Sequence, residues 1–458
     1  MRSNYASSAD SEKSLLLSRE QSKSISVDDP YSALAPSKQL QSLPRLMSTF
    51  SFCFANGCML CSYFIITLPL ESARISEDLK SLYLGCFIAI AGLTQLMCPL
   101  IGMLSDICSH RWGRRRPFMV LGGLFGCTFL SLQLYASVNE LWSLYSFAFA
   151  MSMMSLNTIF SSMVGMVPDL IDESQVGAAN GVQAVLSVTG GLFGFGFFYF
   201  VLDKQIPGLY VLYIFLVAST IVLTVLSAQE TPIPIPYNGE RRIFHSLPIS
   251  EVKKSYYLTP SEHGDFFWVT LSRTFYYMGI SAQTFFLYFL KDIIKMSDPA
   301  AGVSILSSVA QCSAALSAYP VGLFSDRLNR GRKMFIYGSC FILAIGNAAF
   351  LFCRNLTSVI VISGLIGMGN GGYLSMDSAL AVDCLPNKEE SAKYLGIWGV
   401  ASFIGTALGP MIGGPLLYFA GQTDIPGNYS IEGYALLLSM SVVYFIIAAL
   451  VLKKVKSD

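Results

Sequence analysis

Long apolar blocks separated by short polar stretches dominate the chain, and many blocks run for about 20 residues without a charge. An α-helix needs about 20 such residues to cross a hydrocarbon core of about 30 Å. The pattern therefore predicts an all-α membrane protein. It has twelve spans, near 48–69, 81–105, 117–136, 141–166, 176–201, 209–228, 266–290, 300–325, 334–352, 358–381, 394–419 and 433–452.

The spacing of the blocks divides the chain into two groups of six spans. Residues 1–47 are polar and serine-rich, which predicts a disordered tail. We expect one six-helix half over 48–228 and a second over 265–452. A proline-dotted linker at 229–264 joins them, and a short tail follows at 453–458.

Composition supports a membrane location. Apolar residues make up 53% of the 458 positions and charged residues only 13%, against roughly 25% charged in soluble domains. The net charge of +1 gives no electrostatic basis for nucleic-acid binding. The expected surroundings are a lipid bilayer, and the protein is expected to work as a monomer.

The positive charges predict the orientation. Most of the 30 Lys and Arg residues fall on the side of the membrane that also holds both termini, which predicts cytosolic termini. Two glycosylation sequons, at Asn355 and Asn428, fall on the opposite side. Glu12 with Leu16 and Leu17 fits an acidic di-leucine sorting pattern, so the plasma membrane and a lysosomal or vacuolar membrane both stay open.

Several motifs recur in the two halves in the same order. Gly102-x-x-Ser-Asp106 recurs as Gly322-x-x-Ser-Asp326. Three glycines of the fifth span recur in the eleventh, and the two sets are Gly181, Gly190 and Gly194, and Gly396, Gly405 and Gly409. Such repeats indicate a duplicated six-span unit, which is how one large class of transporters is built.

The loops after the second and eighth spans carry a resemblance to a known family. They read SDICSHRWGRRRPF from Ser105 and SDRLNRGRKM from Ser325. Both resemble the G-x-x-x-D-R-x-G-R-R/K loops of the major facilitator superfamily. The first loop, together with VDCLPNKEESAKYLG from Val382, also resembles plant-type sucrose transporters and the glycoside–pentoside–hexuronide cation symporters. The resemblance implies twelve helices working by alternating access.

These loops are candidate gates. A carboxylate at a helix N-terminus is favoured by the helix dipole, and the arginines can pair with acids of the neighbouring loop. The alternative is that the arginines serve only to fix the orientation of the spans in the membrane. The candidate gate residues are Asp106, Arg114, Arg115, Arg116 and Asp169 in the first half, and Asp326, Arg330, Arg332 and Asp383 in the second.

The family resemblance implies a central cavity lined by spans 1, 4, 7 and 10. Amides and tyrosines suit a polyhydroxylated ligand, because amides bond hydroxyls and rings stack on the apolar faces of sugars. The alternative is hydrogen bonding between helices without ligand contact. The candidate ligand residues are Asn56, Tyr63, Asn157, Arg273, Tyr276, Tyr277, Gln283, Asn370 and Tyr373.

Two charges inside predicted spans are candidates for ion coupling. Arg273 is well inside span 7, and Asp377 lies at a similar depth in span 10. Intramembrane ionisable residues are costly and point to function, so a pair is expected. The cation-coupled sugar symporters keep carboxylates in spans 1, 2 and 4, and here those spans have none at depth. Proton symport and facilitated diffusion therefore both stay open.

The sequence thus predicts a secondary transporter of a small polar solute, most simply a sugar. The alternatives are an exporter or antiporter of another organic solute, such as a metabolite or drug, and a non-transporting membrane receptor or scaffold. The three histidines do not cluster, and the Cys58-x-x-Cys61 pair lies inside a span, so we expect no metal site. No phosphate loop or nucleophile motif is present, and we expect no cofactor and no enzyme activity.

Overall fold

Helices make up almost all of the part of the chain that the computed structural model describes. The described residues are 40–106, 108, 110–172, 175–200, 205–228, 230, 260–327, 331–386, 391–425 and 427–456. Within them the structure is 85% helix and contains no strand beyond one isolated bridge, between Gln422 and Tyr429. The predicted tail at 1–47 and linker at 229–264 lie mostly outside the described residues.

Eleven helical segments of the described chain are long and apolar enough to cross a membrane. The first six spans are α3 (Phe52–Ser62) with η2 (Tyr63–Thr67) and α4 (Leu68–Ile75); α5 (Lys80–Gln95) with α6 (Cys98–Asp106); α7 (Arg116–Val138); α8 (Trp142–Leu170); α9 (Val176–Phe200); and α10 (Ile206–Ser227). Five of the last six are α14 (Pro299–Arg327), α15 (Arg332–Phe350), α16 (Leu356–Asp383), α17 (Ser391–Gly421) and α18 (Ile431–Leu452).

The remaining predicted span, 266–290, is built from three consecutive helices. They are α12 (Pro260–Ile280), η4 (Ser281–Phe285) and α13 (Phe286–Asp292). This segment is not among the eleven, and α12 carries the charged residues Asp265 and Arg273. The fold is therefore the predicted all-α membrane architecture of twelve helices.

Prolines explain two irregular helices. The wide turn η2 ends just before Pro69, and the break between α5 and α6 comes just before Pro99. A proline lacks the N–H that would close the preceding helical turn, and its ring collides with the carbonyl four residues back. The short helix α2 (Leu43–Thr49) precedes the first span and packs on α9 and α10.

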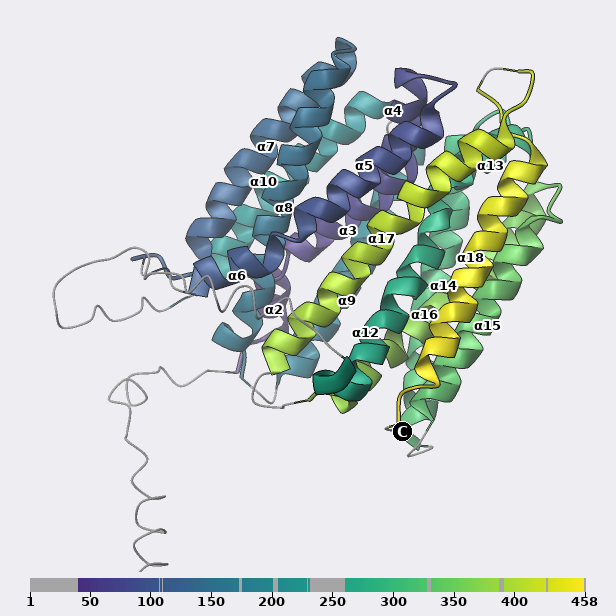
Figure 1. Cartoon of the computed structure of the whole chain (residues 1–458). Helices are drawn as coiled ribbons and strands as arrows, with labels where there is room; N and C mark the ends of the chain where they lie inside the picture. Colours follow the sequence, from purple (N-terminus) through teal and green to yellow (C-terminus); the bar gives the residue numbers. More distant parts are fainter. Residues whose placement is uncertain are drawn as a thin grey trace, which may run out of the picture. The chain divides into compact units, whose positions relative to one another are not determined.

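The helices pack as two groups of six. In the first group α3 packs on α9, and α7 packs on α8 and α10. In the second group α14 and α15 pack on α16, while α12 packs on α17 and α18. The two groups meet where α5 lies along α17 and where α9 lies against α14, and the α5–α17 pair runs diagonally through Figure 1.

Matching glycines place the same helix contact in both groups. A Cβ atom on Gly190 would lie 2.0 Å from the Phe54 carbonyl oxygen, and one on Gly405 would lie 2.3 Å from the Thr274 carbonyl oxygen. Only glycine allows backbones to approach this closely. Two of the three repeated glycines therefore make equivalent contacts, Gly190 and Gly194 between spans 5 and 1, and Gly405 and Gly409 between spans 11 and 7.

The turns between the helices lie at the two ends of the bundle. The turns after α4, α7, α13, α15 and α17 lie at one end, which we name the Asn428 end. The turns after α6, α8 and α16 lie at the other, which we name the Arg115 end. Both sequons lie at the Asn428 end, where the Asn355 side chain caps α16 by accepting a hydrogen bond of 2.8 Å from the Ser358 N–H. Use of these sequons stays a prediction.

Candidate functional site

A pocket lies between the two groups of helices. The empty space among its lining atoms is about 550 Å³, part of which is open solvent. The residues that line it are Cys61, Ile65 and Phe195 from the first group, and Gln283, Phe286, Leu306, Ser307, Ala310, Gln311, Ser363, Ile366, Gly367 and Asn370 from the second.

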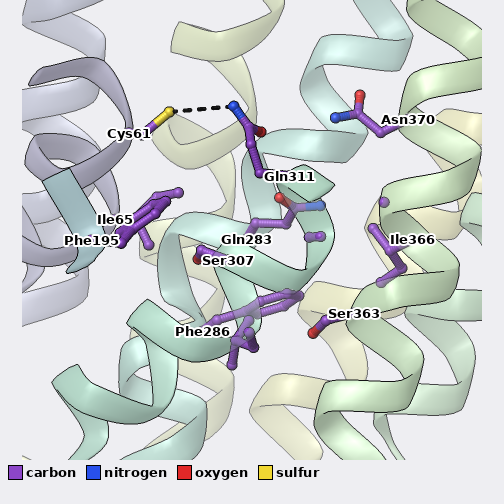
Figure 2. A pocket seen from close by; sticks show the side chains of 13 residues that line it. Cys61, Ile65, Phe195, Gln283, Phe286, Ser307, Gln311, Ser363, Ile366 and Asn370 are labelled. Atoms are coloured by element: carbon purple, nitrogen blue, oxygen red, sulfur yellow. Dashed lines mark hydrogen bonds between the residues drawn. The ribbon is translucent and has the colours of Figure 1, made fainter. Parts of the chain in front are cut away.

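The two groups contribute different chemistry to this pocket. The second group supplies the amides of Gln283, Gln311 and Asn370 and two serine hydroxyls, whereas the first group supplies two apolar side chains and a thiol. Figure 2 shows Gln311 and Cys61 facing each other, with the amide donating to the Cys61 sulfur at 3.9 Å. The arrangement offers hydrogen bonds from one wall and apolar contact from the other.

Two of the nine predicted ligand residues line the pocket, Gln283 and Asn370. Tyr63 is fully buried within the first group, where it accepts a hydrogen bond from Gln133 and stacks on Phe149. The Asn157 amide donates to the Thr94 hydroxyl at 3.0 Å. Neither of them lines the pocket, and neither does Asn56, which is half-buried in α3.

Two stacked tyrosines connect the pocket with the charged residues. The ring of Tyr276 lies parallel to that of Tyr373, with centroids 3.5 Å apart, and its hydroxyl donates to the Asn370 amide oxygen. Both rings are fully buried. A ligand that moves the Asn370 amide would therefore also disturb this pair of rings.

Arg273 and Asp377 form the predicted buried pair. The guanidinium donates to the carboxylate, and the two side chains are 9% and 2% exposed. The guanidinium also lies over two rings, 3.5 Å from the Trp398 centroid and 4.9 Å from that of Tyr277. Asp377 lies seven residues beyond Asn370 in α16, about 10 Å along the helix toward the Arg115 end, so the pair is next to the pocket and not in its wall.

The candidate gate of the first group is a network of ion pairs around the buried Arg115 and the partly buried Asp169. Arg114 and Arg115 both donate to the Asp169 carboxylate, Arg115 at 2.9 Å. Arg115 also donates to the Ser105 hydroxyl, so it ties α6 to the end of α8. Gly113 has a φ of +104°, and a Cβ there would lie 2.1 Å from a carboxylate oxygen of Glu230. This explains the glycine before the three arginines.

The candidate gate of the second group is described only in part. Arg332 pairs with Asp383 at 2.6 Å and also donates to the Ala379 carbonyl oxygen. The glycine of this motif, Gly331, again has a positive φ, of +148°, and precedes the first residue of α15. Arg330 and the side chains of Asp106 and Asp326 lie outside the described residues. Each described pair joins elements of a single group.

Sequence reasoning missed Glu230, just after α10. Its carboxylate accepts a hydrogen bond of 2.9 Å from the Arg115 N–H and lies beside Asp169 and Arg116. Burial raises the pKa of Glu230, and the Arg115 N–H and the Arg116 charge partly oppose that shift. Its position, directly after a span and opposite a basic loop, was the available signal.

Replacing Asp169 by asparagine should destabilise the Arg115 end by about 1–2 kcal/mol, because two arginines lose a charged acceptor. The melting temperature of the purified protein should fall. The matched control is Asp424→Asn, at an exposed acid in the loop after α17, which should leave it unchanged. Equal melting temperatures for the two variants would mean that the buried cluster contributes nothing to stability.

Twelve helices in two similar groups, with a polar pocket between them, define a membrane-transport fold. The chain matches the family profile of the Major Facilitator Superfamily over residues 46–297 and again over 269–458. It belongs to this superfamily, and it is a membrane transporter and not an enzyme.

Similar curated proteins match over short stretches. The chain is 32% identical over 84 residues to MFS transporter L2 of Phoma sp., which is 18% of this chain and 14% of that protein. It is 22% identical over 169 residues to the lactose permease of Lactobacillus helveticus, 33% of this chain and 26% of the permease. The matched part is thus well under two thirds of either relative.

Solved structures share the fold over most of the chain. A variant of the nucleoside transporter NupG is 15% identical and superposes with a TM-score of 0.64, covering 90% of this chain and 98% of that one. A bacterial homologue of the human lysosomal transporter Spinster, in an inward-facing and unoccupied conformation, is 14% identical, with a TM-score of 0.63 and coverage of 90% and 95%. At these identities the likeness concerns the fold alone.

Proposed function

We propose that this transporter moves a small, uncharged, polyhydroxylated solute, most simply a sugar, by alternating access. The observation that supports this proposal most directly is the pocket, where three amides and two hydroxyls lie among apolar side chains that include Phe195 of the first group and Phe286 of the second. Amides supply both donors and acceptors, as a ring of hydroxyl groups requires. The partial match to a lactose permease agrees with this substrate class.

The proposal orients the protein with its Arg115 end in the cytosol. The basic loops before α7 and α15 support this orientation, because cytosolic loops retain Lys and Arg. The ion clusters around Asp169 and Asp383 would then hold the cytosolic ends of each group while the groups move against each other. Arg273 and Asp377 are the proposed coupling residues, with a proton as the candidate ion.

A binding panel tests the substrate class. Purified protein is heated with hexoses, disaccharides, nucleosides or amino acids, and bound solutes raise its melting temperature. Solutes that bind are then tested for flux in proteoliposomes. We expect a sugar to bind and to be transported. Binding of a nucleoside or an amino acid alone would refute the sugar proposal, and binding without flux would refute transport of that solute.

Pocket variants refine the same test. Gln283→Leu and Gln311→Leu should each weaken binding about 3- to 10-fold, the effect of one neutral hydrogen bond. Asn347→Leu is the matched control, since this amide is buried in α15 away from the pocket and bonds the Leu343 carbonyl. A larger loss of affinity in the control would place the ligand elsewhere.

A further inference from the structure

A buried lysine crosses from the first group of helices to the second at the Asn428 end. Lys80 is the first residue of α5, and its side chain is 1% exposed. Desolvating an ammonium is costly, and the positive end of a helix dipole at this position adds to the cost. The surroundings of Lys80 must therefore provide strong compensation.

The groups in direct contact with the ammonium belong to the second group, and Glu77 of the first group adds a weaker attraction. The Lys80 ammonium donates to the Gly427 carbonyl and lies 3.7 Å from Asp292 Oδ1, whose side chain is 0% exposed. It also lies 4.7 Å from the ring centroid of Tyr288 and 4.9 Å from that of Tyr429. We name these four residues, Asp292, Gly427, Tyr288 and Tyr429, the ammonium cage.

The second group also holds the cage in shape. Asp292 Oδ2 accepts hydrogen bonds from the Tyr434 hydroxyl at 2.7 Å and from the Tyr429 N–H at 3.2 Å. Among the described residues, Oδ1 accepts no hydrogen bond, and the Lys80 ammonium lies 3.7 Å from it. An acceptor left open for a cation, beneath two aromatic rings, is the chemistry that recognises an ammonium ion.

The cage lies beyond the pocket, toward the Asn428 end. Asp292 and Tyr288 are in α13, which begins at the pocket residue Phe286. Around Lys80, Tyr288 donates to the Pro69 carbonyl at 2.9 Å, and Tyr429 donates to the Ser81 hydroxyl at 2.9 Å. These are contacts between the two groups, so opening this end must pull Lys80 out of the cage.

We propose that the second group carries a binding site for a primary ammonium, that Lys80 is its built-in occupant, and that occupancy of this site locks the Asn428 end. The idea rests on the proposed alternating access but not on the identity of the solute. It goes beyond the pocket, because the cage would also accept a free alkylammonium ion once Lys80 is absent.

The test is chemical rescue with a conformational readout. Two fluorophores are attached through encoded non-natural residues at Asn139 and Thr357, which are exposed at the Asn428 end of the two groups. Energy transfer between them, in single reconstituted molecules, reports whether this end is closed. The assay needs no substrate, so failure here and failure of the sugar proposal are distinguishable.

We expect Lys80→Ala to raise the open population at least tenfold, and millimolar butylammonium to restore closure. Butylammonium is the probe because it replaces the lost side chain. Lys80→Ala combined with Asp292→Asn should not respond. Lys291→Ala is the matched control: its pair with Glu77 also joins the groups, at 3.4 Å, but is exposed, so it should change the population less than twofold.

Three results would overturn the proposal. They are an unchanged population in a folded Lys80→Ala protein, no recovery with butylammonium, and equal recovery with tetramethylammonium or sodium chloride. Should Lys80→Ala fail to fold, Asp292→Asn provides a second route. This variant keeps the shape of the cage and should open the Asn428 end without rescue, and closure like that of the wild type would refute the lock.

Discussion

Asp377→Ala should destabilise the protein by about 3–5 kcal/mol, the cost of leaving one member of a buried ion pair without its partner. The Arg273 guanidinium stays charged and its side chain is 9% exposed, so in the variant no carboxylate compensates the cost of burying this charge. The Trp398 and Tyr277 rings over the guanidinium offset only part of that cost. The melting temperature of purified protein measures the effect.

The control for this prediction removes both charges. Arg273→Leu with Asp377→Leu should recover most of the lost stability, because replacing a buried pair by apolar residues is often neutral. If the double variant is as unstable as Asp377→Ala, the loss comes from packing around Tyr276 and Tyr373 and not from the unpaired charge.

A second substitution at Asp377 tests the proposed proton coupling. Asp377→Asn keeps the shape of the side chain but cannot exchange a proton, so it should abolish accumulation against a gradient and spare exchange of internal solute. Uptake into proteoliposomes with and without a pH gradient measures this. Wild-type uptake that ignores the gradient, with an unchanged Asp377→Asn variant, would make the protein a uniporter and the pair structural.

The fold was predictable because its signal is strong. About 20 apolar residues in a row have few alternatives to a span, and the boundaries agree to within a few residues for most helices. The first span is an informative exception. Glu71 and Arg74 are typical of a polar loop, so the sequence predicts an end at 69. The helix in fact continues to Ile75. In the structure Glu71 is fully buried and bonds Ser137.

The pocket was less predictable. Hydropathy does not show which face of an apolar helix points to a cavity. The sequence pattern therefore does not indicate Ser307 and Gln311 of span 8, which line the pocket, and it indicates Tyr63, which does not. Lys80 stands at the edge of a span, just after Asp78, which is a usual position for a loop cation. Its burial depends on Asp292 and Gly427, which are more than 200 residues away in the sequence.

Arg273 and Asp377 could be recognised from the sequence, because a charged residue inside a membrane span is costly and therefore rare. The Asp169 cluster was found because its arginines and acid fall in neighbouring loops, which connectivity alone brings to the same end. Residues whose role depends on contact between the two groups were the ones that sequence could not assign. Those contacts are set by how the groups pack, and each span pattern describes only one helix.

Contact between the groups leads to the second large expected effect. Gly414→Val should hold the Asn428 end open and reduce transport more than tenfold. A Cβ at Gly414 would lie 2.4 Å from the Ser81 carbonyl oxygen, and one at Gly85 would lie 2.7 Å from that of Pro410. Here α5 and α17 touch backbone to backbone, so an added side chain separates them.

Gly399→Val is the matched control, since this glycine is in the same helix and a Cβ there would meet nothing within 4 Å. Both variants carry the same cost of a β-branched residue in a helix. The Asn139–Thr357 energy transfer and the uptake rate should change only for Gly414→Val. Butylammonium should not restore closure here, because the obstacle is steric and Lys80, the natural occupant of the cage, is still present in this variant. Normal closure and flux in Gly414→Val would show that α5 and α17 need not touch at this point during transport.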